Sequence, residues 1–163
     1  MSIPISRRDL LGGAALAAGA ITLGTYGGEV GANETYAFRL SDEQWRKRLG
    51  PAAYGVLRRE DTERAWTSPL LKEHRRGTFL CAGCALPLFK SETKFESGTG
   101  WPSFYAPIRC AVGTTTDRKF GIARTEVHCR RCGGHLGHVF DDGPRPTGKR
   151  YCMNGLALKF RPS

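Results

Sequence analysis

The sequence predicts an α+β fold that is mainly β-structure, with short helices first and an antiparallel β body after them. Two observations carry this prediction. A helix-start signature occupies residues 40–45, and from Gly77 onward short apolar runs alternate with turn residues. The composition agrees, because 21 glycines and 9 prolines among 163 residues suit many turns better than long helices. This length fits one domain with a sizeable core.

The first 32 residues are predicted to be an export leader rather than part of the fold. Ser6-Arg7-Arg8-Asp9-Leu10-Leu11 resembles the bacterial twin-arginine motif, and residues 10–28 carry no charge and are rich in glycine and alanine. We therefore expect a signal peptide at 1–32, a folded domain at 33–163, and export by the twin-arginine route to the periplasm. An uncleaved amphipathic anchor is the alternative, and it would make the leader the chain's one membrane contact.

The helical part is predicted to consist of two short helices. Ser41 and Gln44 form a capping box, in which each side chain bonds the other residue's main-chain N–H. A helix should follow to about Leu49, and Pro51 suits the first position of a second helix. Residues 61–76 are charged and irregular, so we expect them to form a connector.

Five short strands are predicted after this connector, from apolar and β-branched runs bounded by turn residues. They are residues 78–80, 86–89, 122–128, 136–140 and 156–160. Because no long helical pattern separates these strands, we expect them to pair in an antiparallel manner.

Four of the six cysteines form two Cys-x2-Cys pairs, Cys81 with Cys84 and Cys129 with Cys132, separated by 44 residues. Each pair offers two thiolates from one tight turn, and two such turns together make a closed tetrahedral zinc site. We therefore expect one structural Zn²⁺ per chain. The alternatives are two disulfides or a redox-active pair in an oxidising compartment. The predicted export route argues against both, since it carries proteins that have already folded and loaded their metal.

Cys152 is predicted to be the reactive thiol. Arg150, Cys152 and Asn154 alternate along the chain, so in a strand their side chains point to one face. A cation two residues away stabilises the thiolate, which is the nucleophilic form of cysteine. A buried structural cysteine is the alternative.

Two histidines and one tryptophan are further candidates. Imidazole exchanges protons near neutral pH, so His135 and His138 suit acid–base catalysis, and as metal ligands they would instead form a mixed Cys/His site. Glycines and a proline within residues 98–104 fix the indole of Trp101 in a loop. Such an indole suits an apolar wall for a small group, and it suits an ordinary core position equally well.

Five motifs together resemble the type B methionine-R-sulfoxide reductases, in family order between Leu40 and Phe160. They are Cys81-x2-Cys84, Ser97-Gly-Thr-Gly-Trp-Pro-Ser-Phe104, Arg124-Thr-Glu-Val-His-Cys129, Gly134-His-Leu-Gly-His-Val-Phe140 and Arg150-Tyr-Cys-Met-Asn154. The resemblance implies two antiparallel β-sheets with N-terminal helices and a structural zinc. It also implies reduction of the R epimer of methionine sulfoxide in oxidised proteins and peptides.

The resemblance implies a reaction as well. The Cys152 thiolate attacks the sulfoxide sulfur while His135 or His138 protonates the leaving oxygen. Methionine leaves and Cys152 becomes a sulfenic acid, which a second thiol can condense with to form a disulfide.

Four other matched residues receive roles by the same resemblance. Trp101 and Phe140 would bind the substrate, with the Trp101 indole holding the methyl group. Arg150 would favour the Cys152 thiolate, and Asn154 would help to place one histidine ring.

One position departs from the family pattern. Many members have a cysteine, the resolving thiol, where this chain has Thr99. Cys110 is the remaining spare thiol, so we expect it to take the resolving role by condensing with Cys152. The alternative is that a thioredoxin-like or other external thiol reduces the sulfenic acid directly.

The net charge of +10 raises a competing interpretation. A basic chain with two Cys-x2-Cys pairs could be a zinc-ribbon module that binds nucleic acid without catalysis. The predicted leader argues against this interpretation, because an exported protein would not meet nucleic acid. The Arg150–Asn154 motif also has no purpose in such a module. A thiol–disulfide oxidoreductase that uses one Cys-x2-Cys pair is a second alternative. We expect a monomeric reductase that binds no nucleic acid.

Overall fold

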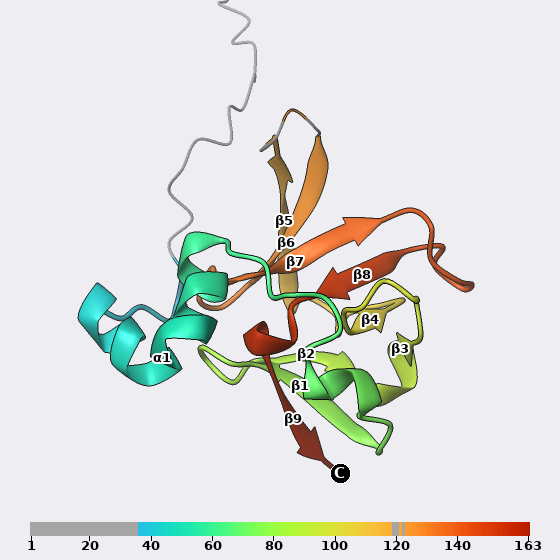
Figure 1. Ribbon diagram of the computed structural model, residues 1–163, viewed down its shortest axis with the longest axis horizontal. Coiled ribbons are helices and arrows are strands. Elements are labelled where there is room, and N and C mark those ends of the chain that lie inside the picture. The colour runs from blue at the N-terminus through green and yellow to red at the C-terminus, as the bar shows by residue number, and fades with distance from the viewer. Residues whose placement is uncertain (1–35, 119–120, 122) are drawn as a thin grey trace, which may run out of the picture. The chain divides into compact units, whose positions relative to one another are not determined.

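The computed structural model describes residues 36–118, 121 and 123–163, which belong to one compact unit, Glu34–Ser163 (Figure 1). The predicted leader at 1–32 lies outside the described residues, as does residue 122 at the predicted start of one strand. Among the described residues, no helix combines the length and the apolar character that a membrane crossing needs.

Helix α1 (Asp42–Arg59) contains the two predicted helical segments, separated by a kink at Gly50. The predicted capping box is present, since Gln44 N donates to Ser41 Oγ at 3.2 Å and Ser41 N donates to Gln44 Oε1 at 2.9 Å. Gly50 has a φ of 70°, a left-handed conformation that glycine adopts without steric cost. The chain therefore stops one helix at Gly50 and starts the next at Pro51, as predicted.

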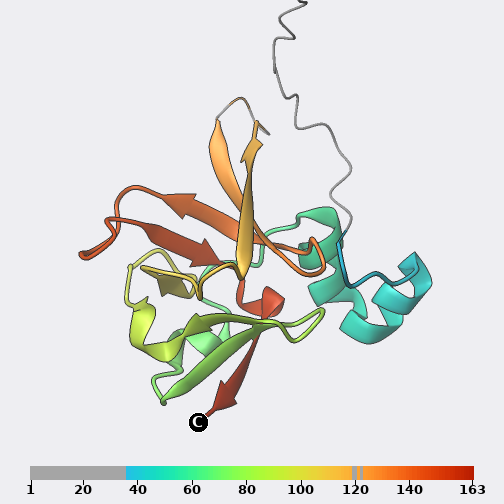
Figure 2. The ribbon, with the colours of Figure 1, turned by 180° about the vertical axis from the view of Figure 1, so that it is seen from behind.

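The β body consists of two antiparallel sheets, which confirms the predicted fold class. The three-stranded sheet has the order β2 (Pro87–Lys90), β1 (Gly77–Cys81) and β9 (Leu158–Pro162). The six-stranded sheet has the order β3 (Lys94–Phe95), β4 (Ser103–Phe104), β8 (Arg150–Met153), β7 (His135–Phe140), β6 (Arg124–Cys129) and β5 (Val112–Asp117). Short 3-10 helices η1 (Pro69–Lys72), η2 (Ser91–Thr93) and η4 (Gly155–Ala157) lie between these elements. In Figures 1 and 2 the smaller sheet lies below the larger one, with α1 to one side.

Strand β5 was missed by the sequence analysis. Its sequence, Val112 to Asp117, contains three consecutive threonines and no apolar alternation. It forms the outer edge of the six-stranded sheet, and its central residues are exposed. An exposed edge strand needs no hydrophobic face, so the pattern that identifies buried strands is absent from it.

Three phenylalanines join the two sheets. Phe79 and Phe89 come from β1 and β2 of the small sheet, and Phe104 comes from β4 of the large one. The ring centroids of Phe89 and Phe104 are 4.3 Å apart in a stacked pair, and those of Phe79 and Phe104 are 4.9 Å apart edge to face. This packing fixes β4, which pairs directly with the strand that carries Cys152.

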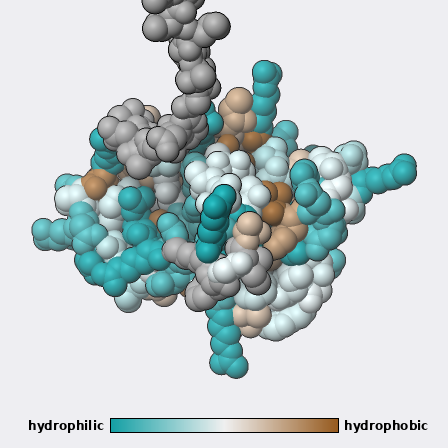
Figure 3. Space-filling view, turned by 90° about the horizontal axis from the view of Figure 1, so that it is seen from above, coloured by the Kyte–Doolittle hydropathy of each residue, from teal (hydrophilic) through white to brown (hydrophobic). Residues whose placement is uncertain are grey.

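The surface is largely hydrophilic on the face drawn in Figure 3, where hydrophobic patches are small and interrupted. Among the described residues, Trp66 is the single large hydrophobic side chain that is exposed, at 66%. Its main-chain N–H donates to Gly100 O at 2.8 Å, next to Trp101. The connector before η1 is thereby attached to the Trp101 loop.

Candidate active site and metal centre

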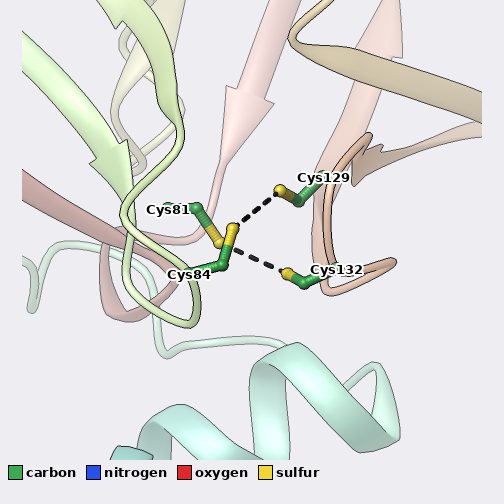
Figure 4. Close-up of side chains that lie close together, drawn as sticks. All are labelled: Cys81, Cys84, Cys129 and Cys132. Carbon is green, nitrogen blue, oxygen red and sulfur yellow. Dashed lines mark hydrogen bonds between the residues drawn. The ribbon is translucent and has the colours of Figure 1, made fainter. Parts of the chain in front are cut away.

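Four buried thiols from two turns point toward one another (Figure 4). Their Sγ atoms lie within 4.8 Å of one another, and the hydrogen-bonded pairs Cys84–Cys129 and Cys81–Cys132 are 3.5 and 3.7 Å apart. A tetrahedral Zn²⁺ with Zn–S bonds of about 2.3 Å places its sulfurs about 3.8 Å apart. The four thiols therefore fit a closed tetrahedral metal site. All six cysteines are free, so the disulfide alternative is wrong for this structure.

Each Cys-x2-Cys turn is built by the same main-chain pattern. Ala85 N donates to Cys81 O at 2.8 Å, and Gly133 N donates to Cys129 O at 2.8 Å. The residue after each pair is left-handed, with a φ of 58° at Ala85 and 67° at Gly133. These turns bring two sulfurs of each pair to one side, so the metal-binding geometry follows from the local sequence.

The buried thiols are hydrogen-bonded to one another, and these bonds shift their pKa values in opposite directions. Hydrogen bonds within the cluster, from Cys129 to Cys84 and from Cys132 to Cys129, lower the pKa of Cys84 and of Cys129. For Cys81 and Cys132, the hydrogen bond to Cys129 raises the pKa. Four buried sulfur donors are the soft ligand set that a divalent cation such as Zn²⁺ holds as thiolates.

The second site is a pocket of about 130 Å³ with Cys152 in its wall. The pocket is lined by Thr62, Trp101, Arg124, Gly137, His138, Phe140, Cys152 and Asn154. Cys152 is half-buried in β8, where it pairs with His138 of β7 on one side and with Ser103 of β4 on the other. A thiol and an imidazole therefore stand at directly opposite positions of neighbouring strands.

Arg150 lies beside the pocket and is itself held firmly. Its Nε and NH2 groups donate to the two carboxylate oxygens of Asp142 at 2.8 and 2.9 Å. Its guanidinium stacks 4.3 Å from the ring centroid of Phe140, which lines the pocket. The Asp142 hydrogen bond raises the pKa of Arg150, and the interaction with Cys152 raises it further. Arg150 and Cys152 therefore lie within electrostatic reach, as their alternation predicted.

The two histidines have different surroundings. The Nε2–H of His138 donates to Asp117 Oδ2 at 2.8 Å, which leaves Nδ1 to take up or release a proton. Burial lowers the pKa of His138, and the hydrogen bond with Asp117 opposes this shift. His135 is buried, and its Nδ1–H donates to Glu126 Oε1 at 2.8 Å. His138 lines the pocket with Cys152, whereas His135 does not.

Thr99 occupies the space next to the Cys152 sulfur. Its Oγ1 lies 3.7 Å from Cys152 Sγ and 2.8 Å from Ser97 Oγ, and Ser97 Oγ lies 2.7 Å from Ser103 Oγ. A chain of three hydroxyls therefore ends at the sulfur. Each hydroxyl can donate or accept, so the chain can satisfy either a thiol or a thiolate at Cys152.

Comparison with known proteins agrees with this arrangement. Residues 49–162 match the SelR domain. Peptide methionine sulfoxide reductase MsrB of Leptospira interrogans is 53% identical over 127 residues, which is 77% of this chain and 97% of that protein. The protein of the same name from Leifsonia xyli is 56% identical over 129 residues, or 78% of this chain and 93% of that protein. The chain belongs to the SelR-domain family, the type B methionine-R-sulfoxide reductases.

Membership of this reductase family makes the chain an oxidoreductase and confirms the resemblance drawn from the five motifs. It also decides against the zinc-ribbon module and the thiol–disulfide oxidoreductase, because relatives that are 53% or 56% identical to this chain over the matched residues are peptide methionine sulfoxide reductases.

The reductase pocket contains both predicted substrate-binding residues, Trp101 and Phe140. Asn154 also lines it, but its amide bonds the main chain: Oδ1 accepts from Glu63 N at 2.9 Å and Nδ2 donates to Leu136 O at 3.2 Å. These contacts hold a loop and β7, and the expected support of a histidine ring stays a prediction.

Cys110 lies apart from the reductase pocket. It is exposed, with a φ of 59°, in the turn before β5, whereas Cys152 is in β8. Strands β6 and β7 separate the two in the sheet. Three strand spacings amount to about 14 Å, whereas disulfide-bonded Cα atoms lie within about 7 Å of each other. The expected Cys110–Cys152 disulfide would therefore need a large movement of the chain.

Sequence reasoning missed three residues at this site. Asp117 and Arg124 belong to β5 and β6 and meet beside His138, where Arg124 NH2 donates to Asp117 Oδ2 at 2.7 Å. Glu63 lies in the connector and bonds both Trp101 and Asn154. Asp117 lies 21 residues from His138, and Glu63 lies 38 residues from Trp101 and 91 from Asn154, so no local spacing could have linked them to these residues.

Proposed function

We propose that this chain reduces the R epimer of methionine sulfoxide in proteins and peptides to methionine, with Cys152 as the nucleophile. The observation that carries the proposal is the pocket in which the Cys152 thiol stands opposite His138 and beside the Trp101 indole. A polar reacting pair next to an apolar wall suits a substrate with one polar sulfoxide and one methyl group. The similarity to peptide methionine sulfoxide reductases supports the same reaction.

The reaction balances with the residues present. The Cys152 thiolate attacks the sulfoxide sulfur, and His138 gives its proton to the sulfoxide oxygen as the S–O bond breaks. The attack forms a bond between Cys152 Sγ and the substrate sulfur. The hydroxyl then moves from the substrate sulfur to Sγ as this S–S bond breaks, so methionine leaves with its sulfur reduced and Cys152 remains as a sulfenic acid. Arg150 supports the thiolate by its charge, and Trp101 and Phe140 hold the methyl group and side chain of the substrate.

Regeneration requires two reducing equivalents from thiols. We favour direct attack by an external thiol, such as a thioredoxin-like protein or a small thiol, on the Cys152 sulfenic acid. This attack forms a mixed disulfide and releases water, and a second thiol then frees Cys152. The separation of Cys110 from Cys152 and the hydroxyl of Thr99 beside the sulfur support this route over an internal disulfide.

The four-thiol cluster would hold one Zn²⁺ in a structural role. Four buried sulfurs at the spacing of a tetrahedral site support this proposal, because they leave no coordination position for substrate or water. When bound, the metal supplies folding energy rather than chemistry, on the order of 10–16 kcal/mol of apparent binding free energy.

The proposed reaction is tested with separated R and S epimers of a methionine sulfoxide peptide and dithiothreitol as reductant. We expect the purified protein to convert the R epimer and leave the S epimer unchanged. The Cys152→Ser variant should convert neither, while keeping wild-type metal content and far-UV circular dichroism. The matched control is Cys110→Ser, which removes the other thiol outside the metal cluster. Conversion of the S epimer alone, or full activity of Cys152→Ser, would refute the proposal.

A further inference from the structure

Glu63 is a buried acid in the connector between α1 and η1. Its exposed fraction is 8%, and it is the one acidic residue among the buried residues of the described part. Buried carboxylates are rare unless hydrogen bonds satisfy their oxygens. The burial of this carboxylate therefore requires a structural or functional reason.

The carboxylate of Glu63 holds the chain directly after β8. Its Oε2 accepts from Gly155 N at 2.6 Å and from Leu156 N at 3.2 Å. A Cβ on Gly155 would lie 3.1 Å from this oxygen and 1.9 Å from Ser68 Oγ, so the close approach depends on glycine. The segment that follows Cys152 by three residues is thereby tied to the connector.

The main chain of Glu63 holds two walls of the pocket. Its carbonyl oxygen accepts from Trp101 Nε1 at 2.8 Å, and its N–H donates to Asn154 Oδ1 at 2.9 Å. Trp101 and Asn154 both line the pocket with Cys152. One residue thus contacts two separate segments, the loop that carries Trp101 and residues 154–156 after β8.

We propose that Glu63 is the positioning residue for the substrate methyl group. Its buried carboxylate fixes the connector against Gly155 and Leu156, and the connector's carbonyl then fixes the Trp101 indole opposite Cys152. Glu63 does not touch the substrate, so it acts through Trp101. This inference rests on the proposed reduction of methionine sulfoxide, because that reaction gives the Trp101 wall its substrate.

The test compares Glu63→Ala with Glu63→Gln in steady-state reduction of the R-epimer peptide. In Glu63→Ala we expect KM to rise by about 10-fold and kcat/KM to fall by about 100-fold, because a misplaced wall weakens binding and orientation. Glu63→Gln should stay within about 3-fold of wild type, since one amide oxygen can accept both N–H groups. Arg64→Ala, an exposed neighbour in the same loop, is the control and should keep wild-type constants.

Two measurements distinguish a displaced Trp101 side chain from a general disruption of the site. Alkylation of Cys152 by iodoacetamide, which needs no methyl-binding wall, should proceed at the wild-type rate in Glu63→Ala. The double variant Glu63→Ala with Trp101→Phe should lose no more activity than the worse single variant, because both changes break the same hydrogen bond. Additive losses, or wild-type KM in Glu63→Ala, would overturn the inference.

The indole N–H signal of Trp101 gives a readout that needs no activity. In ¹⁵N-labelled protein this signal, assigned by its loss in Trp101→Phe, should exchange with solvent faster in Glu63→Ala than in wild type, and unchanged exchange would count against the inference. If Glu63→Ala fails to fold, the Glu63→Asp variant replaces it. Its carboxylate is shorter by one methylene and cannot reach Gly155 N. A wild-type KM in Glu63→Asp would overturn the inference. A wild-type protein that reduces neither epimer would instead refute the proposed function.

Discussion

His138 and His135 differ in where their rings lie relative to Cys152. His138 lines the pocket, whereas His135 is buried against Glu126. We therefore expect His138→Ala to slow single-turnover release of methionine by roughly 100-fold, the usual scale of general acid help. His135→Ala should leave that rate within about 5-fold and instead lower the free energy of unfolding by about 1–3 kcal/mol, because Glu126 loses its partner. Equal rate losses in both variants would contradict this assignment.

The pH dependence of the reductive step follows from the pKa of His138. Burial lowers this pKa, and Asp117 raises it. The acid form is lost as pH rises through the pKa, so the single-turnover rate should fall with rising pH. Asp117→Asn removes the raising interaction, so the fall should begin at a lower pH than in wild type. Asp141→Asn, an exposed acid paired with Lys149, is the control and should leave the profile unchanged.

Cys110 gives a prediction about the reductant. Because the sheet separates it from Cys152, Cys110→Ser should turn over as fast as wild type with dithiothreitol and with a thioredoxin-like protein. One equivalent of substrate should leave the Cys110 thiol titratable in the wild-type protein, whereas Cys152 becomes unreactive. Peptide mapping that links Cys110 to Cys152 would favour the internal disulfide instead.

Residue roles were predictable where the residues stand close together in the chain. The alternation of Arg150 and Cys152 placed a cation beside a thiol, and the structure brings them within electrostatic reach. Asp117 and Glu63 reach the site only through sheet pairing and a long connector. Their roles depend on tertiary structure, so the sequence pattern carried no sign of them.

At the scale of elements, the two Cys-x2-Cys turns join the small sheet to the large one, since Cys81 ends β1 and Cys129 ends β6. Cys132→Ser should therefore lose the bound metal and unfold, because metal-binding free energy in such sites is folding free energy. Metal content by mass spectrometry and thermal unfolding measure both effects, with Cys110→Ser as the thiol control. A folded, active Cys132→Ser protein without metal would show that the cluster is dispensable.

The elements themselves were predictable to different degrees. The break at Gly50 and the apolar strands followed from local rules, since capping and hydrophobic alternation act over a few residues. Strands β3 and β4 have two residues each, and β5 is polar, so none of them carries a pattern of its own. These segments become strands because they pair with neighbouring strands of the sheet.

At the scale of the whole chain, we propose that residues 1–32 direct export of the folded reductase by the twin-arginine route. The paired arginines and the uncharged Gly/Ala-rich run support this proposal. The double change Arg7→Lys and Arg8→Lys should keep the protein in the cytoplasmic fraction, as measured by fractionation and immunoblotting. Changing Arg58 and Arg59, the pair at the end of α1, to lysine is the control. Normal export of the leader variant would disprove this route.

The β6–β7 hairpin carries cluster thiols at its turn and pocket residues at its open end. Cys129 and Cys132 lie at the turn, whereas Arg124, His138 and Phe140 lie toward the other end. With the metal bound as proposed, an oxidant that expels it would release the turn and deform the pocket while Cys152 stayed intact. The oxidant concentration at which reductase activity is lost would then depend on how well the metal cluster resists oxidation. Activity would be lost abruptly at that concentration rather than decline gradually.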